Sequence, residues 1–466
     1  MFMQQKIQRR HPFPWGTIFT ILILGLFSSG ILSLVFFYPR IIGSKPVLAI
    51  MDTGHQQVQT LSIGKTPRFL IDVANNKSGV CEVTAKVSQN GMDFSLALEE
   101  AEQEIDPNDQ SVKLVFVPSF QNFSGLNEGP ATLESVARNC AWLARKTSLT
   151  MPVEVDLIPP TVALTSTQHY INQGGADVAT YHVSPDTVWS GVKVGGYVFN
   201  GHVKPGTKNS QGERFSFFVF SYELPQNTPI EIVAIDAAGN EAQTTLVPAK
   251  FFAKQFRHRD LPVDDQFIQT KVFDIMANTP GLSRSGDLLK DYLSVNRDLR
   301  KKNAAQLVEV SKKSDEKFYW KDAFRPLTNA SVEANFADYR NYIYNGQKVD
   351  EQVHLGFDLA VVEKHPILAA ADGRVLFAGY MGIYGNTIII DHGYGLMTLY
   401  GHLSSMDVSE GQEITKEQKI GNSGATGLAG GDHLHFSMLI DGVQTNPIEF
   451  WDQHWIHDHV YLRVKL

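Results

Sequence analysis

The longest apolar run in the chain lies near its first residue. Residues 15–38 (WGTIFTILILGLFSSGILSLVFFY) form 24 consecutive positions without a charged side chain. As a helix, this run would extend about 36 Å and cross a hydrocarbon layer of roughly 30 Å. Lys6, Arg9 and Arg10 precede it, a mild bias that favours a cytoplasmic N-terminus. The pattern predicts a transmembrane anchor over 15–38 that follows a cytoplasmic arm, residues 1–14.

A cleaved signal peptide is the alternative for the same run. Signal peptides have apolar cores of about 7 to 15 residues followed by an A-x-A-like cleavage site. The run is longer, and no such site follows it. We therefore expect a single-pass protein of the cytoplasmic (inner) membrane, with its N-terminus inside and the bulk of the chain periplasmic or otherwise extracytoplasmic.

Short alternating runs broken by polar turns indicate β structure from residue 45 to residue 250. In VCEVTAKV (80–87), for example, alternate residues share one face of a strand. A stiff pair, Pro159-Pro160, separates two modules, 45–158 and 159–250. Both are predicted to be β-sandwiches, the second immunoglobulin-like, and a spacer role is the expected one.

The chain has two cysteines, Cys81 and Cys140. Outside the cytoplasm they can oxidise to one disulfide, and the alternative is a pair of buried thiols. Their spacing suits a bridge between the two sheets of the first module. Two cysteines are too few for a cysteine-ligated zinc or iron–sulfur site, so any metal must be held by His, Asp or Glu.

The apolar spacing becomes helical between Val263 and Lys313, within a segment that we place at 251–322. Basic residues between the apolar positions are typical of a solvated helix face. Because this segment lies between the predicted anchor and the C-terminal domain, we expect it to border the groove of that domain and limit access. Its deletion would then raise activity.

From residue 323 to 456 the pattern returns to short β runs bounded by glycines, among them GNTIIIDHGYG and HLHFSMLIDG. We predict a compact, mostly antiparallel β domain, so the whole chain is expected to be mostly β. Composition agrees with a globular protein, at 43% hydrophobic and 19% charged residues. The formal net charge of -8 gives no overall basic footprint for nucleic acid, which we exclude as a partner.

Two histidine motifs in this domain point to metal chemistry: His354-Leu-Gly-Phe-Asp358 and His433-Leu-His435. On a straight strand, residues four apart are separated by about 13 Å, so the first pair needs a bend, which Gly356 permits. The two histidines of the second motif share one strand face, so one can ligate while the other acts beside the metal. Two His, one carboxylate and a position for water are the pattern of a catalytic zinc site, which implies hydrolysis.

These motifs resemble those of the lysostaphin-like, LytM-type zinc endopeptidases, which cut peptidoglycan cross-bridges. The resemblance covers roughly residues 324–451 and rests on ANFADYRNY, HLGFDLA, AADGRVLFAG, GNTIIIDHGYGLMTLYGHLS, IGNSGATG, HLHF and the pair Asn446-Pro447, in family order. It implies that His354, Asp358 and His435 bind zinc and that His433 is the general base. His402 then matches a second active-site histidine, which holds the attacking water or the oxyanion.

The resemblance also implies lesser roles. Asn386 and Tyr400 match positions that line the groove, and His392 matches a structural position. The chain departs from the pattern at Gly431-Asp432, which stands where Gly-Pro is commoner. A carboxylate there would affect the pKa of His433 or a substrate subsite.

The implied function is a membrane-anchored zinc metalloendopeptidase that hydrolyses peptide cross-links of peptidoglycan. One alternative is a catalytically silent protein of the same fold that binds the wall and activates another wall hydrolase, since some relatives have lost ligands. A second alternative is proteolysis of secreted proteins. The sequence does not indicate which peptide bond is cut, nor any partner among wall hydrolases or division proteins.

Overall fold

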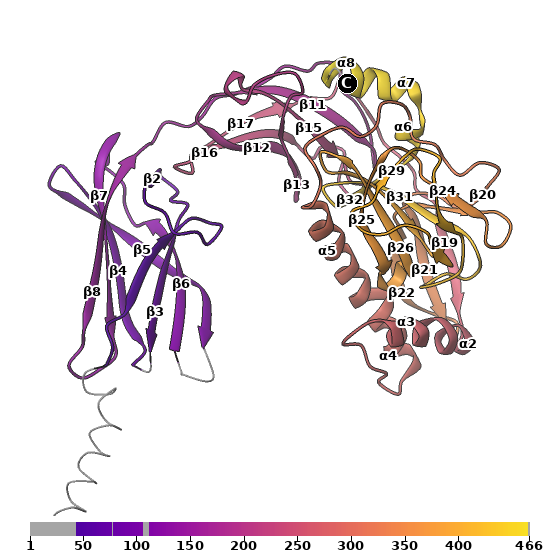
Figure 1. Cartoon of the computed structure of the whole chain (residues 1–466), viewed down its shortest axis with the longest axis horizontal. Helices are drawn as coiled ribbons and strands as arrows, with labels where there is room; N and C mark the ends of the chain where they lie inside the picture. The colour runs from indigo at the N-terminus through magenta and orange to yellow at the C-terminus, as the bar shows by residue number, and fades with distance from the viewer. Residues whose placement is uncertain (1–42, 77, 106–110, 465–466) are drawn as a thin grey trace, which may run out of the picture. The chain divides into compact units, whose positions relative to one another are not determined.

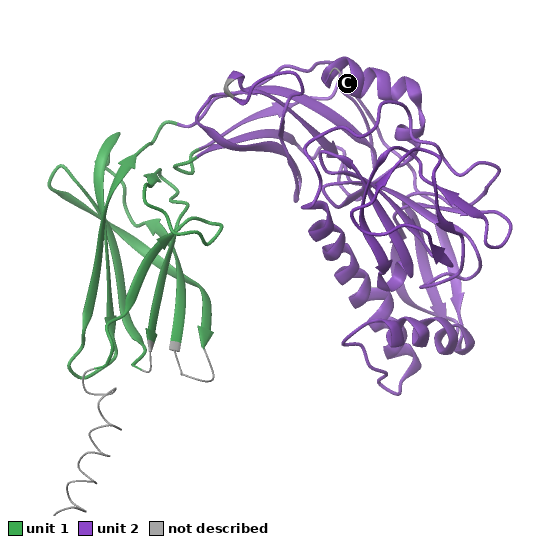
Figure 2. Cartoon of the chain, viewed as in Figure 1, with its two compact units in different colours: residues 1–158, 237–240 green, residues 159–236, 241–466 purple. Residues whose placement is uncertain are grey.

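The computed structural model describes residues 43–76, 78–105 and 111–464, and most of its regular structure is strand (Figure 1). The predicted anchor and cytoplasmic arm lie outside these residues. Within the described part of the chain, no helix has the length and apolar character needed to cross a membrane. The chain divides into two compact units, residues 1–158 with 237–240 and residues 159–236 with 241–466 (Figure 2).

Unit 1 contains one hydrogen-bonded sheet of eight strands. Across the sheet, these are β1 (Val47–Met51), β3 (Leu70–Asn76), β6 (Ser111–Phe120), β5 (Met92–Ile105), β4 (Val80–Gln89), β7 (Gly129–Asn139), β8 (Lys146–Val155) and β2 (Ser62–Ile63). Alternate side chains such as Ala131 and Leu133 on β7 are buried in its core, as the sequence pattern predicts. The strands form one continuous hydrogen-bonded ladder, in which β1 at one end also contacts β7 and β8 near the other end, so the sheet closes over its own core.

Cys81 on β4 and Cys140 just after β7 form a disulfide, with their Cα atoms 4.9 Å apart. β4 and β7 are neighbours in the sheet, where Val80 lies opposite Asn139. The bridge therefore joins adjacent strands, and the prediction of a bridge between two sheets was wrong. The alternation of faces near Cys140 is too short to show on which strand its partner lies.

Residues 159–250 do form a two-sheet sandwich. One sheet contains β14 (His202–Val203), β15 (Glu213–Val219), β11 (Ala176–Val183) and β9 (Val162–Leu164); the other contains β13 (Tyr197–Asn200), β12 (Thr187–Val194), β16 (Ile230–Asp236) and β17 (Glu241–Leu246). A further short pair, β10 (Tyr170–Asn172) with β18 (Lys250–Phe252), is parallel.

The sandwich and the C-terminal domain share one hydrophobic core. Six of the seven residues of β15 are buried, because one face lies inside the sandwich and the other lies against the C-terminal domain. Phe215 of β15 stacks on Phe318 and meets Tyr394 edge-on, with ring centroids 5.7 and 4.9 Å apart. The module is thus built into the same compact unit as the C-terminal domain.

A fully buried carboxylate also joins the sandwich to the last helix. Asp177 on β11 accepts from His169 at 2.6 Å and from His459 at 2.7 Å, and it forms an ion pair with Arg463. Burial raises the pKa of Asp177, but these partners outweigh it and hold the pKa well below its usual range. His459 lies on a helix that packs against the sandwich, although its sequence surroundings indicate only a tail.

The predicted helices begin at Asp265, two residues after Val263, but the first part of the segment placed at 251–322 contains a strand at 258–263. That strand, β19 (His258–Val263), pairs in parallel with β21 in a three-stranded sheet. The helical turns then follow as α2 (Asp265–Phe267), η2 (Ile268–Val272), α3 (Phe273–Asn278), α4 (Leu288–Leu293), η3 (Ser294–Leu299) and α5 (Arg300–Ser311). Their buried residues, such as Ile268 and Leu299, pack on Met397 and Leu439 of the main sheet. The helices form a layer of the domain.

The C-terminal domain is built on a mostly antiparallel sheet, as predicted. In order it contains β20 (Ser331–Ala334), β23 (Phe357–Ala360), β31 (Leu434–Ile440), β27 (Leu396–Gly401), β26 (Asn386–Gly393), β25 (Gly373–Tyr380) and β29 (Glu413–Ile414), with β32 (Val443–Thr445) also on β31. Smaller sheets contain β21 (Asp338–Tyr344) with β22 (Gln347–His354), and β24 (Pro366–Leu368), β30 (Lys419–Asn422) and β28 (Ser405–Met406). The turn η4 (Gly382–Tyr384) precedes β26, and the helical turns α6 (Ile448–Trp451), α7 (Gln453–Trp455), η5 (Ile456–Tyr461) and α8 (Leu462–Val464) follow the sheet.

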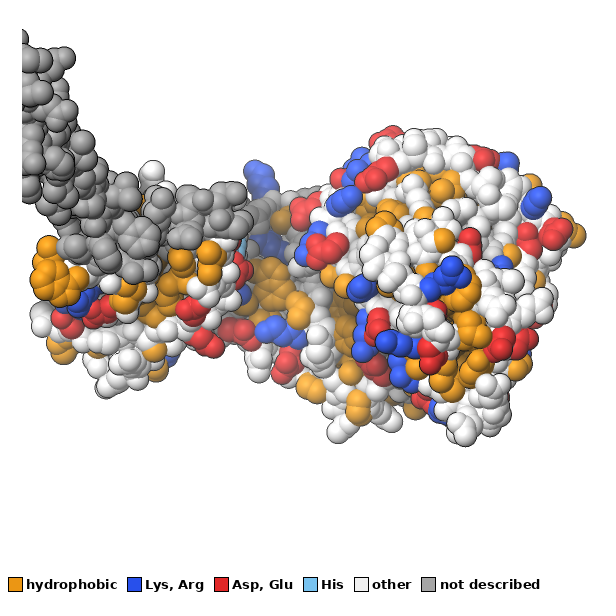
Figure 3. Space-filling model, turned by 90° about the horizontal axis from the view of Figure 1, so that it is seen from below, with side chains coloured by type: hydrophobic (Ala, Val, Ile, Leu, Met, Phe, Trp, Pro, Cys, Tyr) orange, Lys and Arg blue, Asp and Glu red, His pale blue; other side chains and the backbone are white. Residues whose placement is uncertain are grey.

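Charged side chains of both signs are interspersed over the face of unit 2 that Figure 3 shows. Hydrophobic side chains lie between them. This mixture matches the moderate net charge of the chain.

Candidate active site

Three of the predicted ligands are brought together where two neighbouring strands of the main sheet face each other. Asp358 on β23 lies directly opposite His435 on β31, and His354 ends β22, just before the bend that leads into β23. Gly356 occupies that bend, as predicted. The structure adds a second reason for glycine, since a Cβ there would lie 2.6 Å from Ser437 Oγ and 2.7 Å from His435 Nε2.

The three ligand atoms are nearly equidistant. His354 Nε2 lies 2.9 Å from Asp358 Oδ1 and 3.0 Å from His435 Nδ1, and the last two atoms are also 3.0 Å apart. Ligands about 2.0–2.1 Å from a tetrahedral zinc ion lie roughly 3.3 Å apart. Two imidazoles and a carboxylate are ordinary zinc ligands, and all three residues are buried. The group therefore fits a zinc ion in both chemistry and spacing.

Hydrogen bonds on the far side of each ring fix the ligand atom. His354 donates from Nδ1 to the carbonyl of Asn335 at 3.0 Å, which leaves the lone pair on Nε2. The Ser437 hydroxyl donates to the carbonyl of Leu355 at 2.6 Å, so it accepts from His435 Nε2 at 3.0 Å. The lone pair of His435 is then on Nδ1. Such outer partners orient metal-ligating histidines and set their tautomers.

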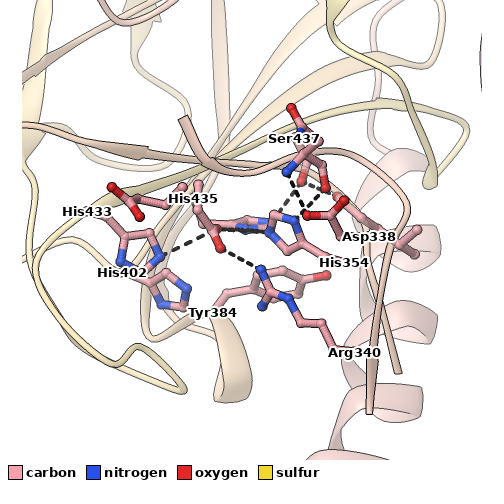
Figure 4. A network of polar contacts seen from close by, with 12 residues as sticks. Asp338, Arg340, His354, Tyr384, His402, His433, His435 and Ser437 are labelled. Carbon is pink, nitrogen blue, oxygen red and sulfur yellow. Dashed lines mark hydrogen bonds and ion pairs between the residues drawn. The ribbon is translucent and has the colours of Figure 1, made fainter. Parts of the chain in front are cut away.

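Two further histidines lie beside the ligands (Figure 4). His433 donates from Nδ1 to the carbonyl of Gly431 at 2.9 Å, and its Nε2 lies 3.4 Å from Asp358 Oδ1. His402 donates from Nδ1 to the carbonyl of Thr426 at 2.8 Å, and its ring lies 4.9 Å from that of His433. In the neutral form of each ring, the lone pair is therefore on Nε2. The structure brings all five predicted polar residues together.

His402 has a left-handed backbone, with φ of 64°. This conformation is unfavourable for a residue with a side chain, and such strain often occurs at functional sites. The His402 amide donates to the carbonyl of Tyr384 at 2.7 Å, which together with the Thr426 contact holds the ring in place. The backbone around His402 is thus fixed from both sides.

Burial favours the neutral form of two of these histidines, His435 and His402. It lowers the pKa of His435 to about 4, and, together with the nearby His433 and His435, it lowers the pKa of His402 well below its ordinary value. Burial also lowers the pKa of His433, but the hydrogen bond to Asp358 outweighs it, so that pKa is raised. Burial alone would raise the pKa of Asp358, yet the charges and hydrogen bonds of its histidine neighbours hold it well below its usual range. The carboxylate is ionised, as metal binding requires.

The ligands open into a cavity of about 330 Å³. One wall comes from the strand and helices that precede the domain, as we expected for the helical segment. The lining residues are Leu261, Pro262, Val263, Phe267, Arg300, Arg340, Tyr342, Ile383, Tyr384, Leu428 and Gly430, with the four histidines and Asp358. The site is therefore a largely apolar pocket with polar groups at one side.

Three further residues of the site were not expected from the sequence: Arg340, Tyr384 and Arg300. Arg340 donates to Asp358 Oδ2 at 2.7 Å, and the Tyr384 ring lies 5.4 Å from that of His435. Arg340 stands in the motif ANFADYRNY, where an arginine before the His354 motif was the available signal. No local pattern marks Tyr384 or Arg300, because their place in the site depends on the fold.

Asn386 and Tyr400 do not line this cavity. Asn386 donates to the carbonyl of Leu403 at 3.0 Å, and the Tyr400 hydroxyl accepts from the amide of Ala370 at 2.8 Å. Tyr400 is buried beside a separate, smaller cavity of about 50 Å³. The two side chains support neighbouring loops, because strand alternation directs Tyr400 away from the face that carries the ligands.

Asp432 and His392 have structural contacts. Asp432 accepts from the Lys364 amide at 3.0 Å, so the carboxylate faces a loop instead of His433. His392 is fully buried between the carbonyl of Asp372 and the hydroxyl of Thr398, each at 2.8 Å. Burial lowers the pKa of His392 to about 4. The structural role predicted for His392 agrees with these contacts.

Residues 352–447, which include the four histidines of the site and Asp358, match the profile of Peptidase family M23. The chain is 40% identical over 97 residues to "DD-carboxypeptidase/endopeptidase Mpg" of Neisseria meningitidis serogroup B, which covers 21% of this chain and 22% of that protein. It is 35% identical over 122 residues to "Peptidoglycan DD-endopeptidase ShyC" of Vibrio cholerae serotype O1, covering 26% and 28%.

A third relative carries a different activity in its name. The chain is 39% identical over 99 residues to "Murein hydrolase activator NlpD" of Escherichia coli K12, covering 21% of this chain and 26% of that protein. The chain thus spans about a quarter of the length of these relatives. The resemblance seen in the sequence is confirmed: the C-terminal part of the chain is a domain of Peptidase family M23.

Proposed function

We propose that this protein is a membrane-anchored zinc metalloendopeptidase that hydrolyses peptide cross-links of peptidoglycan. The observation that carries the proposal is the set of free lone pairs on His354, His435, His433 and His402, which face the ionised Asp358 at one end of the cavity. The names of two relatives, which act on peptidoglycan or its DD-peptide bonds, support the substrate class.

His354, Asp358 and His435 would hold the zinc ion. When bound, zinc acts as a Lewis acid that lowers the pKa of water and polarises a carbonyl. His433 Nε2 is placed to take a proton from the attacking water and return it to the leaving amine. His402 Nε2, which carries the lone pair of a neutral ring, is placed to accept a hydrogen bond from the attacking water and so orient it.

The test is digestion of purified peptidoglycan by the full chain in detergent, with products identified by mass spectrometry. We expect new peptide ends with the wild type and none with His435→Ala, since that variant removes a ligand. Zinc content measured on both proteins tests whether the loss of activity comes from the loss of the metal. An intact wall with a fully zinc-loaded wild type would contradict the proposal.

The second candidate function is activation of another wall hydrolase, which the similarity to the NlpD protein suggests. An activator has no need of a metal site, so the complete ligand set favours an enzyme. Addition of the full chain to a separate amidase would decide. If stimulation of the amidase persists in His435→Ala, the activator role is favoured. If stimulation disappears together with the metal, the enzyme role is favoured.

The proposed location is the cytoplasmic membrane, with residues 15–38 as the anchor and the M23 domain outside the cytoplasm. The uncharged run in the sequence supports an anchor. The Cys81–Cys140 disulfide supports an oxidising compartment. Fractionation of cells with and without alkaline extraction would test it, since a spanning segment resists extraction.

A further inference from the structure

We propose that Arg300 binds a free carboxylate on the amino acid that leaves in the reaction. The inference rests on the proposed function and specifies its substrate. It assigns a binding role to the helical segment, which lies outside the residues matched by the M23 profile. The preferred substrate is a peptide bond whose nitrogen belongs to an amino acid with an ionised carboxyl group.

Arg300 is held in place with donors to spare. Its Nε and Nη2 atoms donate to the carbonyl and side-chain oxygens of Asn296, at 3.1 and 2.8 Å. Asn296 is fully buried and donates in turn to Asp350 at 2.7 Å. A guanidinium has five N–H groups, so three remain for a ligand. Arg300 is thus a fixed cation.

Arg300 has no ion-pair partner among the residues that the structure describes. Two other arginines of this region do have such a partner: Arg297 pairs with Asp350, and Arg340 pairs with Asp358. Asp350 is therefore already shared between Asn296 and Arg297. A cation in a mostly apolar cavity that lacks a carboxylate partner is suited to an anionic ligand.

Arg300 lies on the same cavity as the metal ligands. Tyr384 lines this cavity as well. Tyr384 in turn lies against His435, with ring centroids 5.4 Å apart. A ligand group bound by Arg300 therefore lies in the same cavity of about 330 Å³ as the bond that is cut.

The structure of a peptide limits which ionised carboxyl group can lie near the bond that is cut. When the leaving residue has a free α-carboxylate, the carboxylate is attached to the carbon next to the scissile nitrogen. In an uninterrupted bridge, such as a run of glycines, the same carboxyl group is part of the next amide and has no charge. The position of Arg300 thus favours cross-links to an amino acid with a free carboxylate, and terminal residues, over continuous peptide bridges.

The test uses two synthetic peptides that differ in one group, a free α-carboxylate or a carboxamide on the leaving residue. We measure kcat/KM of the full chain for both. Loss of a charge-assisted hydrogen bond predicts that the wild type prefers the carboxylate peptide by about 10- to 100-fold. In Arg300→Gln, kcat/KM should fall for the carboxylate peptide and stay unchanged for the carboxamide peptide, so the preference is lost. Arg300→Lys should retain part of the preference.

Lys301→Gln is the matched control, because Lys301 is the next residue on the same helix, is exposed and does not line the cavity. It should keep the wild-type preference. Zinc content and circular dichroism should be equal in all four proteins. A structural role of Arg300 would instead reduce hydrolysis of both peptides equally.

The outcomes separate the two proposals. Equal rates for both peptides with the wild type, or an unchanged preference in Arg300→Gln, would overturn the role of Arg300 and leave the endopeptidase intact. If neither peptide is hydrolysed, the proposed function fails, and calorimetric binding of the same peptides then tests Arg300 separately. Binding of the carboxylate peptide that is weaker in Arg300→Gln would support the inference, and equal binding would overturn it.

Discussion

At the scale of single residues, the bend between His354 and Asp358 decides whether the metal group can form. The sequence alone indicates a glycine for flexibility, but the structure shows that Gly356 also makes room for Ser437 and His435. Spacing motifs identified His354, Asp358, His433 and His435, and the family resemblance added His402. The tautomers, Arg300 and Tyr384 depend on contacts between distant segments, so no local pattern predicts them.

We predict that Gly356→Ala loses zinc. Its Cβ would lie 2.7 Å from His435 Nε2, so the ring that supplies a ligand must move. Such overpacking costs typically 1–3 kcal/mol. Zinc content by mass spectrometry and the melting temperature should both fall. Gly196→Ala, where a Cβ meets nothing within 4 Å, is the control, and full zinc occupancy in Gly356→Ala would show that the ligands tolerate the shift.

At the scale of elements, the helical segment is a layer of the domain that also borders the cavity. The sequence pattern predicts its helices but not the sheet face that they cover, because that face is formed by residues much later in the chain, such as Met397 and Leu439. The continuous apolar run FSFFVF likewise indicates a strand covered on both faces, although its partner cannot be read from the run itself.

The contacts of the helical segment predict that its disruption lowers activity. A segment that only blocked the groove would give the opposite result. Asn303 on α5 is buried and accepts from the amide of Ile383 at 3.1 Å, next to Tyr384. Asn303→Ala leaves that buried amide unpaired, which costs about 1–3 kcal/mol. We expect lower thermal stability and lower activity, with the exposed Lys302→Ala unchanged. Higher wall hydrolysis in Asn303→Ala or after deletion of residues 265–311 would instead support a blocking role.

At the scale of the whole molecule, the sandwich and the C-terminal domain are joined by buried polar groups. Glu449 on α6 accepts from the Ala176 amide at 2.6 Å and from the Asn172 side chain at 2.9 Å. Burial raises the pKa of Glu449 to about 7, from an ordinary value of 4.5. The sequence predicts both modules and their order, but not this junction, because a single glutamate near a tryptophan has no distinctive pattern.

We predict a stability that falls as pH rises because of Glu449. The folded state holds the Glu449 proton more tightly than the unfolded state, so the contribution of Glu449 to stability is greatest below pH 4.5, falls between about pH 4.5 and 7, and is then constant. The total is roughly 3 kcal/mol. Urea midpoints across this range should show the slope in the wild type and in the exposed Glu333→Gln, and not in Glu449→Gln. The same slope in Glu449→Gln would assign it to another group.

The buried Asp177 has a consequence for the time at which the protein can finish folding. Its cationic partner, Arg463, follows 286 residues later in the chain. At about 5–20 residues per second, ribosomes make that partner roughly 15 to 60 s after Asp177. Until then the sandwich contains a carboxylate that lacks its main counter-charge, so β11 cannot be buried at low cost. The sandwich therefore completes its core only after the M23 domain has been synthesised, and a ribosome that stalls within that domain leaves an unfinished sandwich exposed to proteases.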